Sequence, residues 1–281
     1  MQKLGVRWTI GDVSEQGFEA LMLSIHGAWT IFGPETSYTV CVNTIPLDAA
    51  RELVGDVPEG ITWHASRADE LPGIIRQHVD GNMSEGVSWK FAPLQLFPDR
   101  HELALDNDLI MWEMPEAVRV WLETDDPQQS LVAEDVRTCF GQFRQFCGPD
   151  PRNLGIRGLP PGFDLEQALR EILRRHPVRL TSELDEQGLQ CAALSLFKPP
   201  LFVSTDDVTI CSPFPPHFKS LGTCGAHFAG LNVRHSPWQV DGRPATECIR
   251  EHWASHRPAI YKHVGADRAR SVQCGTYGCR R

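Results

Sequence analysis

The N-terminal part of the chain alternates between short apolar runs and longer segments with helical spacing. Residues 6–10, 38–45 and 61–64 are short, apolar and rich in β-branched side chains, which predicts three strands. Over residues 14–29 and 47–54, apolar side chains recur three and four positions apart, which predicts two helices. Strands that alternate with helices pair in parallel, and helices then cover both faces of the sheet. The pattern therefore predicts an α/β protein.

The rest of the chain is less regular. Residues 89–98 predict a short helix that ends at a proline, and residues 102–105 predict a buried strand. Residues 153–162 contain three glycines and two prolines and predict a turn-rich loop. A helix is predicted from the capping residue Asp164 up to Pro177, and another over residues 245–256.

Composition and charge narrow the range of partners. The 281 residues are 41% apolar and 22% charged, as in ordinary globular proteins. There are 27 Lys and Arg against 36 Asp and Glu, a net charge of −9, and no basic run stands out. We therefore expect no general binding to nucleic acid or to anionic membranes. No apolar run reaches the roughly 18 residues of a transmembrane helix, and residues 1–10 lack the apolar stretch of a signal peptide. A cytoplasmic location is the expectation.

The nine cysteines are widely spread and include no CxxC pair. A zinc ribbon, a thioredoxin-like site and a secreted disulfide scaffold are therefore not expected, and most of these cysteines are interpreted as small buried apolar residues. Cys274 and Cys279 lie in the C-terminal tail, where a metal site or a pair is conceivable. A frayed terminus is the favoured interpretation of that tail.

Two carboxylates follow the predicted strand 102–105. Asp106 and Asp108 are separated by Asn107 and precede the apolar run 109–112. Two carboxylates at the end of a strand can both reach one Mg²⁺ or Mn²⁺ ion, which prefers oxygen ligands and commonly shares its shell with phosphates. Taken alone, this short motif is equally compatible with a solvated turn. The apolar segments on both sides favour a position at the edge of a sheet.

Histidines supply two further candidates. His227 lies in the glycine-rich segment 222–232, where the backbone can approach a ligand closely and a neutral imidazole can bind a metal. A buried histidine bonded to the backbone is the alternative. His252 and His256 share one face of the predicted helix 245–256. No glutamate follows His252 as in a His-Glu-x-x-His motif, so a catalytic zinc site is not expected there.

Taken in order, the polar segments resemble a known enzyme family. A basic residue precedes a proline-containing helix end and a strand that runs into D-x-D, and then come Asn-x-Gly, an acidic-Gln pair and His-x-x-Gly. These are Lys90 with Pro93 and Pro98, Asp106-Asn107-Asp108, Asn153-Leu-Gly155, Glu186-Gln187-Gly188, and His227-Phe-Ala-Gly230. This order and spacing resemble the GT-A-fold glycosyltransferases, and most closely the glycogenin-like retaining enzymes of glycosyltransferase family 8. The resemblance covers roughly residues 5–240.

The resemblance implies a fold and a reaction. The fold would be a GT-A-like nucleotide-diphospho-sugar transferase fold, α/β with a mostly parallel central sheet flanked by helices. The reaction would be a metal-dependent transfer of a hexose from a nucleotide sugar, expected to be a UDP-sugar, to an unspecified acceptor with retention of configuration. The GT-A-like domain would span residues 1–245, and residues 246–281 would form its C-terminal helix and flexible tail.

The resemblance also assigns roles to residues. Asp106, Asp108 and His227 would hold Mn²⁺ or Mg²⁺ against the donor diphosphate. Asp185, Glu186 and Gln187 would be the catalytic candidates on the far face of the sugar. The expected donor-binding residues are Gly11, Asp12, Lys90, Asn107, Asn153, Gly155, Gly230 and Arg234.

The sequence departs from the family at two places and leaves two alternatives open. Val233 stands where the family has a lysine, so Arg234 is expected to take over the phosphate contact, and Glu186-Gln187 replaces an Asp-Gln pair. A GT-A-like nucleotidyltransferase would use the same metal, but residues 11–17 lack the basic residue that such an enzyme usually carries after its first strand. A non-catalytic nucleotide-sugar-binding protein would lose the metal ligands, which are present here.

Overall fold

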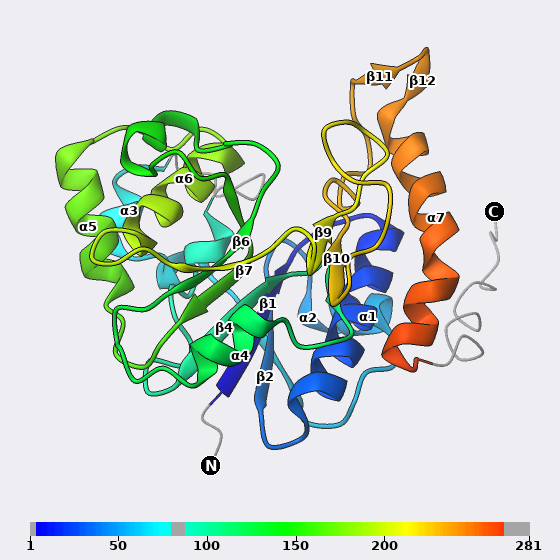
Figure 1. Cartoon of the computed structure of the whole chain (residues 1–281), viewed down its shortest axis with the longest axis horizontal. Coiled ribbons are helices and arrows are strands. Elements are labelled where there is room, and N and C mark those ends of the chain that lie inside the picture. Colours follow the sequence, from blue (N-terminus) through cyan, green and yellow to red (C-terminus); the bar gives the residue numbers. More distant parts are fainter. Residues whose placement is uncertain (1–3, 80–87, 267–281) are drawn as a thin grey trace.

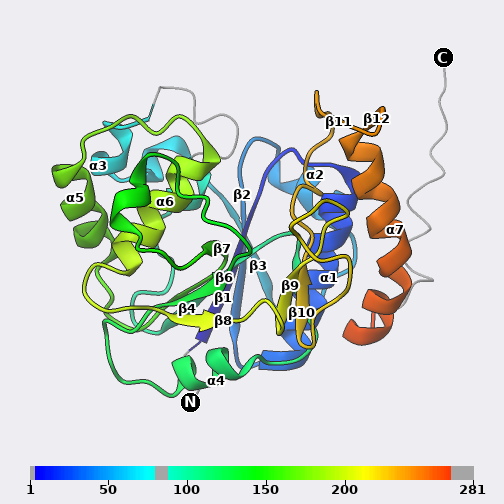
Figure 2. The same ribbon diagram turned by 45° about the horizontal axis from the view of Figure 1, so that its top comes forward.

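The computed structural model describes residues 4–79 and 88–266. A central seven-stranded sheet has the strand order β3-β2-β1-β4-β7-β6-β8, and a small sheet with the order β5-β10-β9 lies beside it. Figures 1 and 2 show α1, α2 and α7 on one side of the central sheet and α3, α5 and α6 on the other. The predicted α/β class, with helices on both sides of the sheet, is confirmed.

The strands are β1 (Leu4–Ile10), β2 (Ser37–Val42), β3 (Ile61–Ala65), β4 (His101–Asp106), β5 (Leu109–Met111), β6 (Leu131–Glu134), β7 (Arg152–Leu159), β8 (Leu201–Val203), β9 (Val208–Ile210), β10 (Gly225–His227), β11 (Gln239–Val240) and β12 (Arg243–Pro244). The α-helices are α1 (Glu15–Phe32), α2 (Leu47–Val54), α3 (Gly73–Arg76), α4 (Glu116–Leu122), α5 (Leu165–Arg175), α6 (Glu183–Leu194) and α7 (Ala245–Val264). Short 3₁₀ turns are η1 (Ala68–Glu70), η3 (Trp89–Phe91) and η4 (Gly141–Phe146).

The central sheet is mostly parallel, as predicted. β1 pairs in parallel with both β2 and β4, and β6 pairs in parallel with β8. β7 runs antiparallel to both of its neighbours, β4 and β6. The chain order reverses between β1 and β4, and in open α/β sheets ligands bind outside the carboxyl ends of the strands at such a point. The site is therefore expected beside the end of β4.

Two hydrophobic clusters hold the layers together. The first contains β1, β2, α1 and α7, with Trp8 and Leu21 fully buried. The second joins β7 to α5 and α6 through side chains such as Leu169 and Leu189. Helix α1 is buried around most of its circumference because it lies between other elements. A Cβ atom at Gly27 would lie 2.0 Å from the carbonyl oxygen of Met111, so this glycine lets α1 approach β5.

The predicted turn-rich loop at residues 153–162 is wrong. Most of it forms β7 (Arg152–Leu159), a strand that is buried along its whole length. Its glycines serve close packing: a Cβ atom at Gly155 would lie 2.7 Å from the His227 ring, and one at Gly158 would lie 2.9 Å from Trp121. The prolines and Gly162 follow the strand, where a turn does form.

The predicted helix at residues 89–98 is also wrong beyond its first turn. Only Trp89–Phe91 forms a 3₁₀ turn. The buried carboxylate of Glu102 accepts hydrogen bonds from the backbone N–H groups of Leu96 and Phe97, at 2.5 and 2.8 Å. These bonds fix the following segment in a conformation other than a helix.

Other predictions hold with shifted ends. Asp164 caps α5 by accepting a hydrogen bond from the Gln167 N–H at 2.8 Å, as predicted. β2 ends at Val42, before the predicted end at 45, and beyond it the Thr44 hydroxyl accepts a hydrogen bond from the Asp12 N–H. The last helix continues past residue 256 to Val264. Cys274 and Cys279 lie outside the described residues, where nothing tests the interpretation of the tail.

Within residues 4–79 and 88–266, no helix is both long enough and apolar enough to cross a membrane. Of the seven cysteines in these ranges, Cys41, Cys147, Cys191 and Cys211 are buried and the other three are half-buried. Most of these cysteines therefore are small core residues, as the sequence predicts.

Candidate functional site

The first carboxylate of the site stands at the carboxyl end of β4. Asp106 is the last residue of that strand and pairs in register with Thr9 of β1. The turn that follows carries Asn107 and Asp108 and leads directly into β5. The D-x-D motif therefore lies at the carboxyl end of β4, where the sheet topology predicts a ligand site.

Pairing in the small sheet brings His227 to this turn. β10 runs antiparallel to β5, with His227 opposite Leu109. The Phe228 N–H donates a hydrogen bond to the Asp108 carbonyl at 2.9 Å, which extends the pairing by one step. Backbone hydrogen bonds thus hold Asp108 and His227, which are far apart in the sequence, next to each other.

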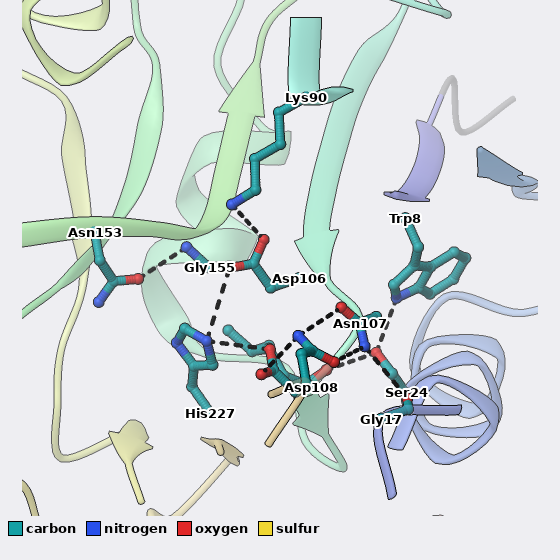
Figure 3. A network of polar contacts seen from close by, with 12 residues as sticks. Trp8, Gly17, Ser24, Lys90, Asp106, Asn107, Asp108, Asn153, Gly155 and His227 are labelled. Carbon is teal, nitrogen blue, oxygen red and sulfur yellow. Dashed lines mark hydrogen bonds and ion pairs between the residues drawn. The ribbon is translucent and has the colours of Figure 1, made fainter. Parts of the chain in front are cut away.

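Asp106, Asp108 and His227 form one compact group, which we call the acidic cluster (Figure 3). The His227 Nε2 atom lies 3.3 Å from an Asp108 oxygen and 3.7 Å from an Asp106 oxygen. One ligand atom from each of the three residues lies within 4.8 Å of the others. The Asp108 and His227 side chains are 4% and 12% exposed, whereas that of Asp106 is 23% exposed. The cluster is therefore nearly enclosed and opens on the Asp106 side.

Charged neighbours surround the acidic cluster. The Lys90 ammonium lies 2.7 Å from Asp106 (Figure 3). Burial lowers the pKa of Lys90, but Asp106 and Glu186 outweigh burial and raise that pKa above its ordinary value. Burial of His227 likewise opposes its charge, yet the hydrogen bond and charge of Asp108 raise the pKa of the imidazole. Without a metal, the two carboxylates thus favour positive charge on both of these side chains.

Glu186 is the second acidic centre beside the cluster. Burial raises the pKa of this carboxyl to about 7, and the charge of Asp106 raises it further, against the opposing effects of Lys90 and Arg157. Its Oε1 atom accepts a hydrogen bond from the Gln190 amide, one turn along α6. A carboxyl group with a pKa near neutrality can exist in both protonation states under ordinary conditions.

The side chain of Asn107, the middle residue of the motif, contacts α1 and Asn232. Its amide donates to the Gly17 carbonyl on α1 at 3.2 Å and to the Asn232 side chain at 2.6 Å. Asn232 in turn donates to an Asp108 oxygen at 3.1 Å. Below the turn, Ser24 accepts a hydrogen bond from the Trp8 indole and donates to the Leu109 carbonyl (Figure 3). These bonds fix the D-x-D turn against α1.

Asn153 and Gly155 lie on β7 beside the ring of His227 (Figure 3). The Asn153 side chain accepts a hydrogen bond from the Gly155 N–H at 2.8 Å and donates to the Glu134 carbonyl at 3.0 Å. The His227 Nδ1 atom, which faces Gly155, is buried and has no hydrogen-bond partner among the described residues. The predicted Asn-x-Gly segment and the predicted histidine are thus brought together.

Asp185 and Gln187 are engaged elsewhere on α6. Asp185 accepts four hydrogen bonds from the backbone and side chains of Thr181 and Gln142, at 2.9 to 3.0 Å. Burial raises the pKa of its carboxyl, but these bonds outweigh burial and hold the pKa below its usual value. The Gln187 amide donates to the Cys139 carbonyl at 2.8 Å. Of the three catalytic candidates, Glu186 is therefore the one that interacts electrostatically with Lys90 and Asp106.

The predicted residues Asp12 and Arg234 meet each other at a separate position. Arg234 makes an ion pair with Asp12 at 2.6 Å and donates to the Val13 carbonyl at 2.8 Å. With His235 and Arg250 it lines an open hollow of about 510 Å³. Both side chains of the ion pair are about half exposed. This basic rim is linked to the acidic cluster through the loop that carries Asn232.

Two further predicted glycines flank these loops. A Cβ atom at Gly11 would lie 2.1 Å from the Asn43 side chain, so any other residue would displace that side chain. Gly230 has a φ of 89°, which favours glycine, and shapes the turn between His227 and Asn232.

The acidic cluster suits a hard divalent cation. Two carboxylates and one imidazole offer oxygen-rich ligation, which fits Mn²⁺ or Mg²⁺ better than a soft metal. The imidazole must be neutral to bind, so a metal would displace the proton that the carboxylates stabilise on His227. Lys90 would supply a further positive charge beside such an ion. With such an ion, the arrangement would supply the positive charge that binds a diphosphate and stabilises a leaving group with negative charge.

Comparison with known proteins decides the fold. No protein-family model and no curated protein matches the sequence. Among solved structures, the chain is similar to the galactosyltransferase LgtC in complex with donor and acceptor sugar analogs, with a TM-score of 0.54 and 13% identity over 93% of this chain and 95% of that one. It is also similar to mouse xyloside xylosyltransferase 1, with a TM-score of 0.55 and 9% identity over 82% of this chain and 99% of that one. The chain has a GT-A fold.

Within this GT-A fold, sequence reasoning misses a buried chain of polar side chains behind Glu186. Gln190 accepts a hydrogen bond from Arg157 at 2.7 Å, and Arg157 donates to Glu102 at 3.1 Å. Arg7 lies 3.6 Å from the same carboxylate. Arg7 and Glu102 lie inside predicted strands, and this is the signal that would have found part of the network, because isolated charges are seldom buried. Arg157 lies in the segment predicted as a loop, where the sequence gives no such signal.

Proposed function

We propose that the protein is a metal-dependent glycosyltransferase that transfers a hexose from a nucleotide sugar, with UDP-sugars as the expected donors, to an acceptor with retention of configuration. The observation that carries the proposal is the convergence of Asp106, Asp108 and His227 within 4.8 Å at the carboxyl end of β4. In the GT-A fold this position lies at the topological switch point of the sheet, where ligands of open α/β sheets bind. A cytoplasmic location remains part of this prediction.

In the proposed enzyme, the acidic cluster and Lys90 bind the donor diphosphate. Asp106, Asp108 and His227 would hold Mn²⁺ or Mg²⁺, which supplies positive charge to the leaving nucleoside diphosphate. The Lys90 ammonium, fixed by Asp106, adds charge on the same side. Asn107 and Asn232 orient Asp108 through their mutual hydrogen bonds. Because these groups are held in place before the donor binds, little reorganisation opposes the reaction.

Glu186 is the residue that we assign to the sugar. Its carboxylate is buried, is coupled to Lys90 and Asp106, and has a pKa of about 7. In its ionised form it would stabilise positive charge that develops at the anomeric carbon as the bond to the diphosphate breaks. Asp185 would be a positioning residue that anchors the start of α6. Asn153 and Gly155 would orient the donor from β7, and Asp12 and Arg234 would contact the nucleotide from the basic rim.

Donor hydrolysis is the direct test of this proposal. Purified protein is incubated with UDP-glucose, UDP-galactose or GDP-mannose in the presence of Mn²⁺, Mg²⁺ or a chelator, and the released nucleotide is measured. We expect slow hydrolysis of a UDP-sugar that requires the metal and stops with the chelator. Calorimetric titration of UDP with and without Mn²⁺ gives the binding component separately.

The outcomes separate the alternatives. Metal-dependent UDP binding without release of nucleotide from any donor would favour a nucleotide-sugar-binding protein. Formation of a nucleotide sugar from a nucleoside triphosphate and a sugar phosphate would favour the nucleotidyltransferase. Equal UDP affinity with and without Mn²⁺ would contradict the metal dependence and with it the role of the acidic cluster.

A further inference from the structure

A second group of potential metal ligands lies outside the proposed active site. Cys211 follows β9, and His252 and His256 lie one turn apart on α7. One ligand atom from each residue lies within 4.8 Å of the others. The Cys211 sulfur lies 3.2 Å from the His252 Nε2 atom, and the two histidine rings are 4.6 Å apart between centroids. We call these three residues the Cys–His cluster.

The separations suit a tetrahedral metal site. Zinc binds thiolate sulfur at about 2.3 Å and imidazole nitrogen at about 2.0–2.1 Å, which places tetrahedral ligands roughly 3.3–3.6 Å apart. The Cys211–His252 distance of 3.2 Å is already close to that range. The ligand atom of the third residue, His256, lies within 4.8 Å of the other two.

A hydrogen bond outside the cluster prepares His256 for this role. Its Nε2 atom lies 2.8 Å from the Lys219 carbonyl oxygen. A carbonyl oxygen can only accept, so Nε2 carries the proton and the lone pair is on Nδ1. Histidine ligands of metals typically donate their second N–H to a carbonyl or carboxylate, which fixes the ring and its tautomer. His256 therefore has the hydrogen-bonding pattern of a metal ligand.

The chemistry of the group selects the metal class. A thiol and two imidazoles are soft and borderline ligands that favour Zn²⁺ over Mg²⁺ or Mn²⁺. Cys211 is 2% exposed, so an ordinary modifying reagent would reach it poorly. Burial raises the pKa of the Cys211 thiol to about 12 and lowers the pKa of the His252 ring to about 4, so both are neutral when no cation is present. A thiolate–imidazolium pair, as in cysteine nucleophiles, is thus disfavoured here.

We propose that Cys211, His252 and His256 form a zinc site that fastens α7 to the end of β9. Binding releases the thiol proton to solvent and forms one Zn–S and two Zn–N bonds, with a water molecule in the fourth position. Glu19 of α1 already holds the same helix through Trp253 and Tyr261, at 3.1 and 2.7 Å. The Cys211 N–H also donates to the His227 carbonyl at 2.8 Å. The zinc site would therefore connect α7 to the strand pair that carries a residue of the acidic cluster.

Cobalt spectroscopy of the full chain tests the proposal independently of the proposed function. Co²⁺ replaces Zn²⁺ in such sites, and sulfur ligation gives a thiolate-to-cobalt charge-transfer band in the near ultraviolet that the sulfur-free acidic cluster cannot produce. We expect the band in the unmodified protein, its loss on addition of Zn²⁺, and its absence in Cys211→Ser. His256→Gln, at a half-exposed position, should weaken Co²⁺ affinity at this site at least about tenfold.

Matched variants make every outcome decisive. Cys248→Ser removes a half-buried cysteine of α7 outside the cluster and should keep the band. Asp108→Asn should also keep it, even if donor binding fails. A folded unmodified protein without the band overturns the proposal, and so does a band that survives in Cys211→Ser, because another cysteine would then be the ligand. A Zn²⁺-induced rise in melting temperature that is equal in folded Asp108→Asn and in the folded double variant Asp108→Asn/His256→Gln likewise overturns it, because the acidic cluster is impaired in both.

Discussion

The acidic cluster and the Cys–His cluster are neighbours on one small sheet, yet their surroundings differ. His227 is on β10 and Cys211 follows the adjacent β9, joined by a backbone hydrogen bond of 2.8 Å. Around His227 stand two carboxylates and the ammonium of Lys90. Around Cys211 lie two imidazoles and the Phe228 ring. The centroid of the Phe228 ring lies 6.5 Å from that of His252 and 6.2 Å from that of His256. One backbone framework thus supports an oxygen-rich group of charged residues and a group that offers sulfur and nitrogen atoms.

The difference shows that the elements packed against the small sheet decide which ligand atoms each cluster contains. The acidic cluster faces the carboxyl end of the central sheet, where a ligand can enter beside the partly exposed Asp106. The Cys–His cluster lies between the end of β9 and α7, the helix that carries both histidines. The first group is suited to exchange ligands, and the second is suited to hold two elements together. The following experiments sharpen or break this division.

Glu186→Gln should have the largest effect, because it removes the ionisable group behind the acidic cluster. We expect hydrolysis of the donor to fall at least about hundredfold. The folded carboxyl has a pKa of about 7 against an ordinary 4.5, so the folded state retains a proton that the unfolded chain releases. The free energy of unfolding therefore falls as the pH rises from 4.5 to about 7. Glutamine does not ionise, so the variant does not lose stability in this way. At about pH 8 the variant should be more stable by on the order of 1–3 kcal/mol.

A kinetic assay checks the predicted loss of donor hydrolysis, and chemical denaturation at two pH values checks the predicted gain in stability. Glu183→Gln, an exposed position in the first turn of the same helix, is the control and should change neither. An active Glu186→Gln enzyme would contradict the assignment of this residue to the sugar.

Asp108→Asn and His227→Ala should each weaken metal-dependent donor binding about ten- to hundredfold, on the order of 1–3 kcal/mol. The double variant should lose less than the sum, because both residues are proposed to ligate one ion. Calorimetric titration of UDP in the presence of Mn²⁺ measures all three. Additive losses, or an unfolded His227→Ala protein, would instead make His227 a core residue.

The affinity of the acidic cluster for Mn²⁺ should rise with pH. Burial lowers the pKa of His227, but Asp108 and Asp106 outweigh burial and raise it above 6.5. Below that raised pKa a proton competes with the metal, so affinity should change by up to about tenfold per pH unit and then level off. The metal-free protein should show the opposite trend: stabilisation by the charged imidazole is complete below the unfolded pKa and is lost as the pH rises through the folded one. Mn²⁺ titrations and thermal melts at a series of pH values check both trends.

Gly155→Ala should weaken Mn²⁺ binding a few-fold through displacement of a ligand. The new Cβ atom would lie 2.7 Å from His227 Nδ1, so the ring must move. Gly158→Ala on the same strand would instead contact Leu131 and Trp121, so it should lower the melting temperature with no change in Mn²⁺ affinity. Equal Mn²⁺ affinities of both variants and the unmodified protein would show that β7 does not support the site.

His256→Gln should have the smallest effect on the donor. It alters the Cys–His cluster, so we expect unchanged UDP affinity in Mn²⁺ by calorimetry. A loss comparable to that of Asp108→Asn would merge the two clusters into one functional unit and break the comparison.

Local pattern is sufficient for the elements of the N-terminal part of the chain, up to the end of α2. The strands and helices from Val6 to Val54 follow their apolar spacing, and Asp164 caps its helix as its side chain predicts. The residues of β7 were misread because Gly155 and Gly158 are also typical of turns. Their role in packing against His227 and Trp121 depends on segments distant in sequence.

The polar residues of the two clusters also divide into those that the sequence identifies and those that only the structure brings together. Asp106, Asp108 and His227 are recognisable because each lies in a motif, D-x-D or His-x-x-Gly, that is continuous in sequence. The pairing of Cys211 with His252 and His256 could not be predicted, since it depends on where α7 crosses β9. The buried contacts of Glu102 and Arg157 depend likewise on the antiparallel placement of β7 beside β4.

The distance along the chain between the residues of the acidic cluster has a consequence for synthesis. Both aspartates emerge from the ribosome well before β10, and the antiparallel pairing of β5 with β10 requires closure of a long loop. Contacts of such high sequence separation form slowly. A nascent chain that has exposed β4 and β5 therefore carries two carboxylates but no third ligand. The proposed metal site would therefore be complete only after β10 has emerged and paired with β5, so metal capture would report this late contact.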